Sequence, residues 1–312
     1  MTLLEVLPDN KILVLGTALW GWGVDRSTAF HMLDRFLQLG GRIVDTATNY
    51  PINKRPDDFG IVIKWISEWI ASNGTKELSV LVKFGATDNM GGRAVNLGSS
   101  FISETEAFLR KCFGTSLAGM AVHWDNRGNG EYDASFIAET VYTMSKLQSA
   151  GLSIGFSGVS RPDLYLSSAP ELSDKWWIQI KENALSSTAR LEYQKFFPKS
   201  TYLAYGINMG GMKLDPPADN SSLVLRGINY QNELIKWLSK FINSNHGLNP
   251  APKNLNELAL FSSYLNPSLR GVVIGPRNMV QLESTICFWN RLRSEASPSM
   301  VSIFPKYPIS IE

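Results

Sequence analysis

The chain has 312 residues, of which 44% are hydrophobic and 19% charged, and its formal net charge is +2. This composition excludes a mainly disordered chain, because such chains hold too few apolar side chains to form a core. The basic residues are scattered and nearly balanced by acidic ones, so we expect no nucleic-acid or polyanion partner.

Two cysteines, Cys112 and Cys287, are too few for a disulfide framework, and their apolar sequence neighbours predict that both are buried. The first residues show no basic segment followed by an apolar one, as a secretory signal would. No window approaches the ~18 apolar residues that a membrane span needs. We therefore expect a cytoplasmic protein without a membrane partner, and a monomer by default.

Short apolar runs recur at regular intervals and are the predicted strands. They are almost continuously apolar and do not alternate with polar residues, which is typical of parallel strands buried on both faces. In chain order the runs cover residues 12–19, 41–47, 78–85, 117–124, 152–160, 176–181, 201–206 and 269–275.

Longer helical patterns fill the intervals between these runs. They cover residues 27–39, 57–72, 100–113, 134–149, 162–168, 187–197, 231–243, 254–264 and 278–293. A strand and a helix repeated about eight times predict an α/β fold, specifically a (β/α)8 TIM barrel, in one domain over residues 1–312. A doubly wound open sheet is the alternative, but residues 20–24 (WGWGV) lack the GxGxxG spacing that it would need after its first strand.

Three segments stand apart from this repeat. We expect an N-terminal β-hairpin that turns at residues 8–11 and closes the bottom of the barrel. Residues 206–230 form a loop after the seventh strand that is too long for a plain connection, and loops of this length usually carry function. Residues 294–312 are expected to be a C-terminal tail.

Polar residues end three neighbouring apolar runs, namely Asp45, Lys83 and His123. Their intervals of 38 and 40 residues match one strand–helix unit, because 312 residues shared among eight units give about 39. The active site of a TIM barrel lies at the carboxyl ends of its strands, so these side chains should meet there. A lone buried charge is costly, which makes Asp45 and Lys83 the expected ion pair. Tyr50 follows in the loop after the second strand, with its hydroxyl over the same mouth.

Each of these residues also has a structural explanation. Asp45 could cap a turn in DTATNYP, Lys83 could extend to solvent, and His123 could be an interior histidine. Their common spacing favours a site. A lysine ammonium lowers the pKa of a nearby tyrosine, which makes Tyr50 a candidate general acid, and an imidazole could orient a carbonyl oxygen. No side chain donates hydride, so a nicotinamide cofactor would supply the electrons.

At this point the sequence resembles the aldo-keto reductase family. The segments that carry the resemblance are LGTALWGWG, IVDTATNY, VLVKFG, MAVHWD, FSGVS, WWIQIKENAL, LAYG and VVIGPRNMVQLEST, which cover nearly the whole chain. The resemblance implies reduction of an aldehyde or ketone to an alcohol with NADPH or NADH, a sugar-derived carbonyl compound being one candidate. It implies that Tyr50 donates the proton, Lys83 tunes the pKa of Tyr50, Asp45 anchors Lys83, and His123 orients the carbonyl.

The resemblance also implies which residues bind the cofactor. Ser160 and Gln179 match residues that contact the nicotinamide carboxamide, and Tyr205 matches the aromatic ring that stacks beneath the nicotinamide. The remaining implied cofactor positions are Thr17, Trp20 and Asp45 near the first strands, and Gly275, Arg277 and Asn278 at the last helix. Phosphates favour helix N-termini and guanidinium groups, so Arg277 indicates NADPH in preference to NADH.

The sequence departs from the family pattern after the tyrosine, at the end of the sixth strand and in the last helix. The departing residues are Pro51, Lys181, Glu182, Gln281, Ser284 and Thr285. The first should alter the rim of the pocket, and the last three leave the adenine and 2′-phosphate contacts open.

Other functions remain possible from the residues alone. Lys83 could form a Schiff base in a lyase or aldolase, although a neighbouring carboxylate raises a lysine pKa and so argues against it. A non-catalytic binding subunit could use the same fold. The sequence has no HxH or HExxH spacing, so we expect no metal site. Trp20, Trp22, Trp124 and Tyr50 could line the mouth for a sugar, or they could simply pack together.

Overall fold

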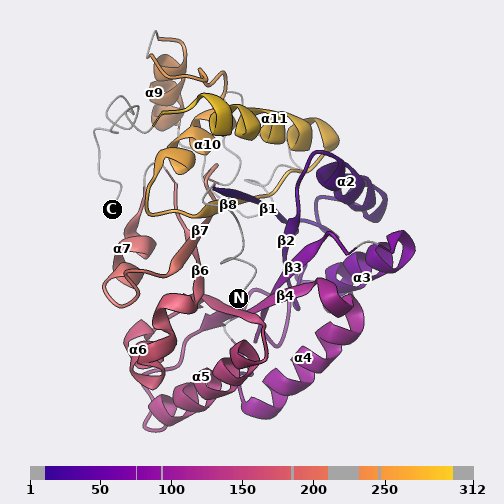
Figure 1. The fold of residues 1–312 in the computed structure, drawn as a ribbon, viewed down its shortest axis with the longest axis vertical. Coiled ribbons are helices and arrows are strands. Elements are labelled where there is room, and N and C mark those ends of the chain that lie inside the picture. The colour runs from indigo at the N-terminus through magenta and orange to yellow at the C-terminus, as the bar shows by residue number, and fades with distance from the viewer. Residues whose placement is uncertain are drawn as a thin grey trace.

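The computed structural model describes residues 11–74, 76–92, 94–183, 186–209, 232–244 and 247–297. At its centre the strands form a closed barrel in the order β1-β2-β3-β4-β5-β6-β7-β8. Figure 1 shows the helices arranged as a ring around these strands. The predicted α/β TIM-barrel fold is therefore confirmed.

Each predicted apolar run coincides with one strand. The strands are β1 (Ile12–Gly16), β2 (Ile43–Ala47), β3 (Ser79–Phe84), β4 (Leu117–Asp125), β5 (Ser153–Val159), β6 (Trp177–Lys181), β7 (Thr201–Tyr205) and β8 (Gly271–Ile274). Neighbouring strands pair in parallel, and β1 pairs with β8 to close the barrel. The sequence predicted that Asp45, Lys83 and His123 end their strands. In the structure each of these strands continues for one or two further residues.

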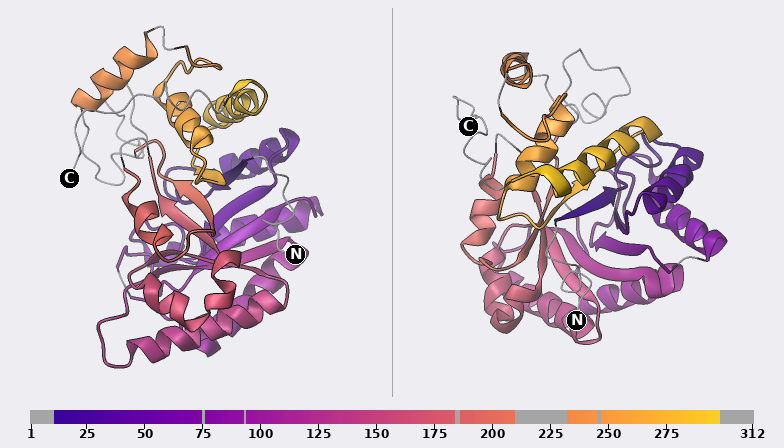
Figure 2. Two further views of the ribbon diagram at one scale, coloured as in Figure 1. Left: turned by 60° about the vertical axis from the view of Figure 1, so that its left-hand side comes forward. Right: turned by 45° about the horizontal axis from the view of Figure 1, so that its top comes forward.

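The helices lie close to their predicted positions. They are α2 (Arg26–Gln38), α3 (Ile61–Asn73), α4 (Ser99–Phe113), α5 (Asp133–Ser149), α6 (Pro162–Ser168), α7 (Thr188–Gln194), α9 (Asn232–Ile242), α10 (Leu255–Leu265) and α11 (Met279–Glu295). Short 3-10 turns cover Pro56–Asp58, Gly114–Ser116 and Pro170–Lys175. Both α9 and α10 connect β7 to β8, and Figure 2 shows α9 farther from the strands than α10.

One predicted helix begins later than expected. The pattern over 57–72 predicts a continuous helix, but α3 starts at Ile61. Gly60 precedes it with a φ of 74°, a left-handed conformation that interrupts the helical path and that glycine adopts without steric cost.

The three segments outside the repeat are only partly visible. The predicted hairpin involves residues 1–10, which lie outside the described residues. Of the predicted loop 206–230, the structure describes residues 206–209. Of the predicted tail 294–312, residues 294 and 295 belong to the last turn of α11, and residues 298–312 lie outside the described residues. Across the described part of the chain, no helix combines the length and apolar character needed to cross a membrane.

The prediction that both cysteines are buried is wrong. Cys287 is exposed and Cys112 is half-buried. The buried face of α11 includes Ile286 and Trp289, and one step along a helix rotates the side chain by ~100°. Apolar sequence neighbours therefore do not place Cys287 on the inner face.

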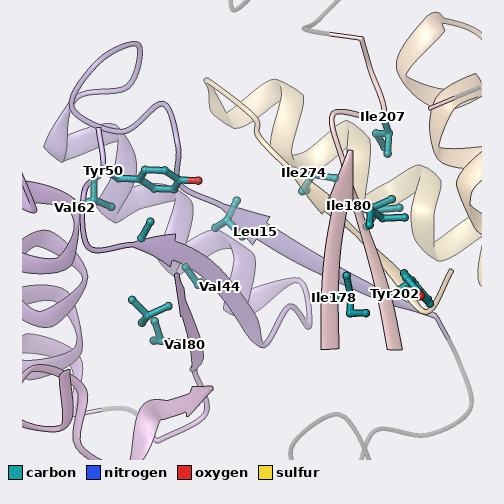
Figure 3. Close-up of a cluster of buried hydrophobic side chains, with 14 of the residues drawn as sticks. Leu15, Val44, Tyr50, Val62, Val80, Ile178, Ile180, Tyr202, Ile207 and Ile274 are labelled. Atoms are coloured by element: carbon teal, nitrogen blue, oxygen red, sulfur yellow. The ribbon is translucent and has the colours of Figure 1, made fainter. Parts of the chain in front are cut away.

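Apolar side chains fill two regions, one between the strands and the helices and one inside the barrel. Figure 3 shows members of the first cluster, including Leu15, Val44 and Val80. Successive residues of a strand point to opposite faces, so the second cluster consists of alternate positions. Its members are Ile12, Val14, Ile43, Leu81, Ala121, Trp177 and Leu203.

The indole of Trp177 packs directly over Gly155 on the neighbouring strand. A methyl group added at Gly155 would lie 2.1 Å from the backbone oxygen of Trp177 and 2.6 Å from its indole. Trp177 is only 1% exposed and has no space into which to retreat. This position therefore requires glycine.

We expect Gly155→Ala to lower the free energy of unfolding by about 1–3 kcal/mol, because it overpacks the barrel interior. Gly158→Ala is the matched control, since it lies on the same strand and its added methyl group meets nothing closer than 3.4 Å. Urea denaturation of both variants measures the difference. Equal midpoints for the two variants would contradict this account of the packing.

Candidate active site

The candidate catalytic residues extend the inward-facing layer of the barrel. Ile43, Leu81 and Ala121 belong to the interior apolar cluster. Asp45, Lys83 and His123 each lie two residues later on the same strands, so strand alternation keeps them on the inner face. Gln179 and Tyr205 follow Trp177 and Leu203 in the same way. The interior apolar cluster therefore lies one layer below these polar side chains inside the barrel.

Asp45 and Lys83 form the predicted ion pair inside the barrel. The Lys83 ammonium donates to Asp45 Oδ2 over 2.5 Å, and the two side chains are 4% and 3% exposed. Gln179 Nε2 donates to the other oxygen of the Asp45 carboxylate, also over 2.5 Å. Both oxygens of this buried carboxylate therefore have a partner, as burial of a charge requires.

Tyr50 lies above this ion pair. It is 7% exposed, and the Lys83 nitrogen is 5.3 Å from the centre of its ring. Figure 3 shows the Tyr50 hydroxyl directed away from Val62 on α3, toward the side of the barrel where Leu15 lies. The His123 ring meets the Tyr50 ring edge-on, with their centres 5.6 Å apart. The structure thus brings the four predicted catalytic residues together.

Lys83 is held in its charged form. Burial alone would lower the pKa of its ammonium, but Asp45 and the hydroxyl of Tyr50 together outweigh burial and raise it above the ordinary value. A Schiff-base lysine needs a depressed pKa to attack a carbonyl. This environment argues against the lyase or aldolase alternative.

His123 is held in its neutral form. Burial, and then the positive charge of Lys83, lower its pKa well below 6.5. The imidazole also packs against Trp124, with ring centres 4.3 Å apart. A neutral imidazole can donate one hydrogen bond and accept another, which its charged form cannot do.

Asn49 is a site residue that the sequence analysis missed. It is fully buried, and its Oδ1 lies 3.1 Å from His123 Nδ1. Its Nδ2 donates to the backbone oxygen of Asp88 over 3.2 Å. Its position beside Tyr50 in DTATNY was the available signal, but nothing in the sequence pairs it with a histidine 74 residues later.

The end of β4, which carries His123, is anchored from outside the barrel. Asp125 is fully buried and accepts from the Tyr165 hydroxyl over 2.8 Å and from Arg127 Nη2 over 2.7 Å. Its backbone oxygen accepts from the Ser160 backbone over 2.8 Å. These bonds join β4 to the start of α6 and restrain the two residues before Asp125.

The loop after Tyr50, which begins at Pro51, is tied by hydrogen bonds to the loop after β3. Asn89, only 1% exposed, donates to the backbone oxygen of Arg55 over 2.7 Å. The Lys54 backbone donates to the backbone oxygen of Asn89 over 3.2 Å. Beside this rim lies a hollow of about 300 Å³ lined by Ile52, Gly91, Gly92, Trp124 and Asn126. It adjoins the residue that follows His123 and so provides room next to the candidate site.

The implied nicotinamide residues have different environments. Thr17 is fully buried and donates to the backbone oxygen of Asp45 over 3.0 Å. Ser160 is exposed just after β5, and Tyr205 is half-buried at the end of β7. Gln179 is 2% exposed and already bonded to Asp45, so it positions this carboxylate whatever else it contacts.

Two of the implied aromatic residues are positioned near the mouth. Trp20 is 1% exposed, and among the described residues its indole Nε1 has no hydrogen-bond partner. Trp22 is half-buried. Trp20 belongs to the core between strands and helices, and Trp22 packs against that core.

The start of α11 has the features of an anion site. Asn278 caps this helix, its side chain accepting from the Gln281 backbone over 2.9 Å. Arg277 Nε is buried and has no hydrogen-bond partner among the described residues. No atom lies within 4 Å of the position of a methyl group added at Gly275. An unpartnered buried guanidinium nitrogen beside open space at a helix N-terminus fits the phosphate end of a dinucleotide.

Within the described part of the chain, no group of three or more His, Cys, Asp or Glu residues could hold a metal ion. His123 is bonded to Asn49, and Asp45 is bonded to Lys83 and Gln179.

Comparison with known proteins places the chain in a family. The family model described as "Aldo/keto reductase family" matches residues 12–209. This match covers more than half of the chain and includes the four candidate catalytic residues. The chain therefore belongs to the aldo/keto reductase family, whose members are oxidoreductases that use nicotinamide cofactors.

Individual relatives are more distant. The norsolorinic acid reductase stcV of Emericella nidulans is 40% identical over 58 residues, which is 19% of this chain and 13% of that protein. Among solved structures, the aldo-keto reductase AKR11C1 from Bacillus halodurans (holo form) is similar, with a TM-score of 0.63 and 17% identity, over 96% of this chain and 95% of that one. At this identity the structural similarity supports the fold.

We expect the stability of the protein to fall as the pH drops below about 6.5, in part because of His123. The folded state lowers the pKa of this imidazole, so below pH 6.5 the unfolded chain binds a proton that the folded chain does not. The stabilisation is complete above the unfolded pKa and is lost as the pH falls toward the folded one. Urea denaturation between pH 7.5 and 5.5 should show a smaller decline for His123→Gln than for the wild type. Parallel declines would contradict the neutral state of His123.

Proposed function

We propose that this protein reduces an aldehyde or ketone to an alcohol with NADPH. The observation that carries the proposal is the placement of Tyr50 above a buried Lys83–Asp45 ion pair and beside a neutral His123. This arrangement activates a phenol as an acid at a protected site. The family to which the chain belongs supplies the reaction class.

The proton transfer follows from the charges of the residues. When bound, the reduced nicotinamide supplies a hydride, which no side chain can do. Tyr50 donates its hydroxyl proton to the carbonyl oxygen and is left as a phenolate. Asp45 holds the Lys83 ammonium in place, and Gln179 holds the other oxygen of the Asp45 carboxylate. The ammonium stabilises the Tyr50 phenolate and thereby lowers the barrier to proton donation.

The residues that we assign to the cofactor lie at separate places around the mouth. Arg277, Gly275 and Asn278 would hold phosphate at the start of α11. Tyr205 and Ser160, which are accessible at the strand ends, would contact the nicotinamide, whereas Thr17, Trp20, Asp45 and Gln179 are buried and would support this part of the mouth from within the barrel. Arg277 is the basis for proposing NADPH in preference to NADH, because a guanidinium binds an additional phosphate strongly.

Replacing the Tyr50 hydroxyl should separate chemistry from binding. We expect Tyr50→Phe to reduce turnover about 10²–10⁴-fold, the contribution of a positioned general acid, while leaving NADPH affinity within error. Loss of NADPH absorbance over a panel of aldehydes and ketones measures turnover, and quenching of tryptophan fluorescence measures affinity. If the variant retained turnover, Tyr50 would not be the acid. If the wild type bound NADPH but reduced no member of the panel, a binding subunit would replace the proposed enzyme.

Replacing Arg277 tests the cofactor preference. We expect Arg277→Gln to weaken NADPH binding about 10-fold or more and NADH binding far less, because only NADPH carries the additional phosphate. The fluorescence titration with each cofactor gives both affinities. Arg293 is a matched control, since it lies near the other end of α11 and Arg293→Gln should change neither affinity. Equal weakening of both cofactors by Arg277→Gln would remove the basis for preferring NADPH.

A further inference from the structure

The carboxyl end of β5 has a strand partner on one side only. Toward β4 the pairing continues to the last residue of the strand, where Val159 pairs with Asp125. Toward β6 it stops earlier, because Phe156 opposite Ile178 is the last pair of that ladder. The backbone groups that face β6 beyond Phe156 therefore need other partners, since buried backbone N–H and C=O groups are rarely left unpaired.

The hydroxyl of Tyr193, on α7, supplies such partners. It accepts from the Val159 backbone nitrogen over 2.9 Å, and it lies 3.0 Å from the backbone oxygens of Ser157 and Val159, which share its one proton. Burial raises the pKa of Tyr193 to about 12, so the hydroxyl keeps this proton at neutral pH. One side chain thus replaces the strand pairing that β6 does not provide at the end of β5.

A buried ion pair at the end of β6 anchors the helix that carries Tyr193. Arg190 Nε, also on α7, donates to both carboxylate oxygens of Glu182, over 3.0 and 2.8 Å. Glu182 follows directly after β6, is 5% exposed, and accepts from Asn266 Nδ2 over 2.9 Å. Glu182 is one of the residues at which the sequence departs from the family pattern, and in the structure it fixes the position of α7.

We propose that Tyr193 is a positioning residue for the nicotinamide end of the cofactor, because its hydroxyl holds the end of β5 that Ser160 follows. This inference rests on the proposed function and deepens it. Ser160 is exposed, and its backbone nitrogen donates to the backbone oxygen of Asp125 over 2.8 Å. The segment before Ser160 is thus fixed from β4 on one side and from α7 on the other. A contact segment that is ordered before binding gives a higher affinity than one that the ligand must order.

Loss of the Tyr193 hydroxyl should therefore affect one end of the cofactor and not the other. Without it the Val159 N–H and two backbone oxygens lose a partner, and residues 157–160 open more often. Binding of the nicotinamide would then have to order this segment. The phosphate end, which we assign to the start of α11, would be bound by a different part of the chain and should keep its affinity.

Two ligands separate the two ends. NADPH carries the nicotinamide, whereas adenosine 2′,5′-bisphosphate carries only the adenosine and its phosphates. We expect Tyr193→Phe to weaken NADPH binding about 10-fold and to leave the bisphosphate affinity within error, because the loss of one hydrogen bond is of this order. Isothermal titration calorimetry gives both affinities without any turnover.

Tyr202→Phe is the matched control. Tyr202 is 1% exposed, and its hydroxyl donates to the backbone oxygen of Phe197 over 2.7 Å, so this variant also loses a buried tyrosine hydrogen bond, but not one to β5. We expect it to leave the ratio of the two affinities unchanged. A selective loss of NADPH affinity in Tyr202→Phe as well would reflect general destabilisation and would overturn the assignment to Tyr193.

Amide hydrogen exchange tests the positioning directly. Without ligand, residues 157–160 should exchange faster in Tyr193→Phe than in the wild type, and saturating NADPH should remove most of this difference. In the wild type, NADPH should slow exchange of the Val159 amide more than the bisphosphate does, and equal protection by the two ligands would overturn the inference. This last comparison requires no substitution, so it does not depend on whether a variant folds.

The outcomes separate this inference from the proposed function. If Tyr193→Phe bound both ligands like the wild type, or lost affinity for both equally, the positioning role of Tyr193 would fail and carbonyl reduction would stand. If the wild type bound neither NADPH nor the bisphosphate, the proposed function would fail and this inference with it.

Discussion

The ion pair between Asp45 and Lys83 is the interaction on which the rest of the site depends. Both groups lie inside a barrel whose floor is apolar, and a buried charge is tolerated only when it is paired and hydrogen-bonded. The 2.5 Å contacts of Asp45 with Lys83 and Gln179 satisfy that condition from two other strands. The carboxylate of Asp45 therefore links side chains of β2, β3 and β6 across the barrel interior.

The same ion pair sets the protonation states of its neighbours. Burial and the charge on Lys83 lower the pKa of His123 and keep this imidazole neutral. The His123 ring is also held by Asn49, whose Oδ1 lies 3.1 Å from Nδ1 of the imidazole. One buried cation thus lies beside both the Tyr50 ring and a histidine that it helps to keep neutral.

The rim of the candidate site is built from the loops that follow β2 and β3. Pro51 begins a loop that Asn89 ties to the connection after β3, and the hollow beside Trp124 lies next to it. The catalytic layer and this rim come from different kinds of structure. Strands fix the first through alternation, whereas hydrogen bonds between loops fix the second, so the rim can change without disturbing the chemistry beneath it.

The sequence by itself determined the barrel and the convergence of Asp45, Tyr50, Lys83 and His123, because apolar runs, their spacing and the inward alternation of strands are local properties of the chain. It did not determine where α3 begins or which face of α11 carries Cys287, since a glycine conformation and a helix rotation decide these. Only the tertiary structure joined Asn49 to His123, which is 74 residues away. A hydrogen bond between a loop side chain and a strand side chain leaves no periodic trace in a sequence, and the second partner of Asn49, the backbone oxygen of Asp88, is a group that any residue could have supplied.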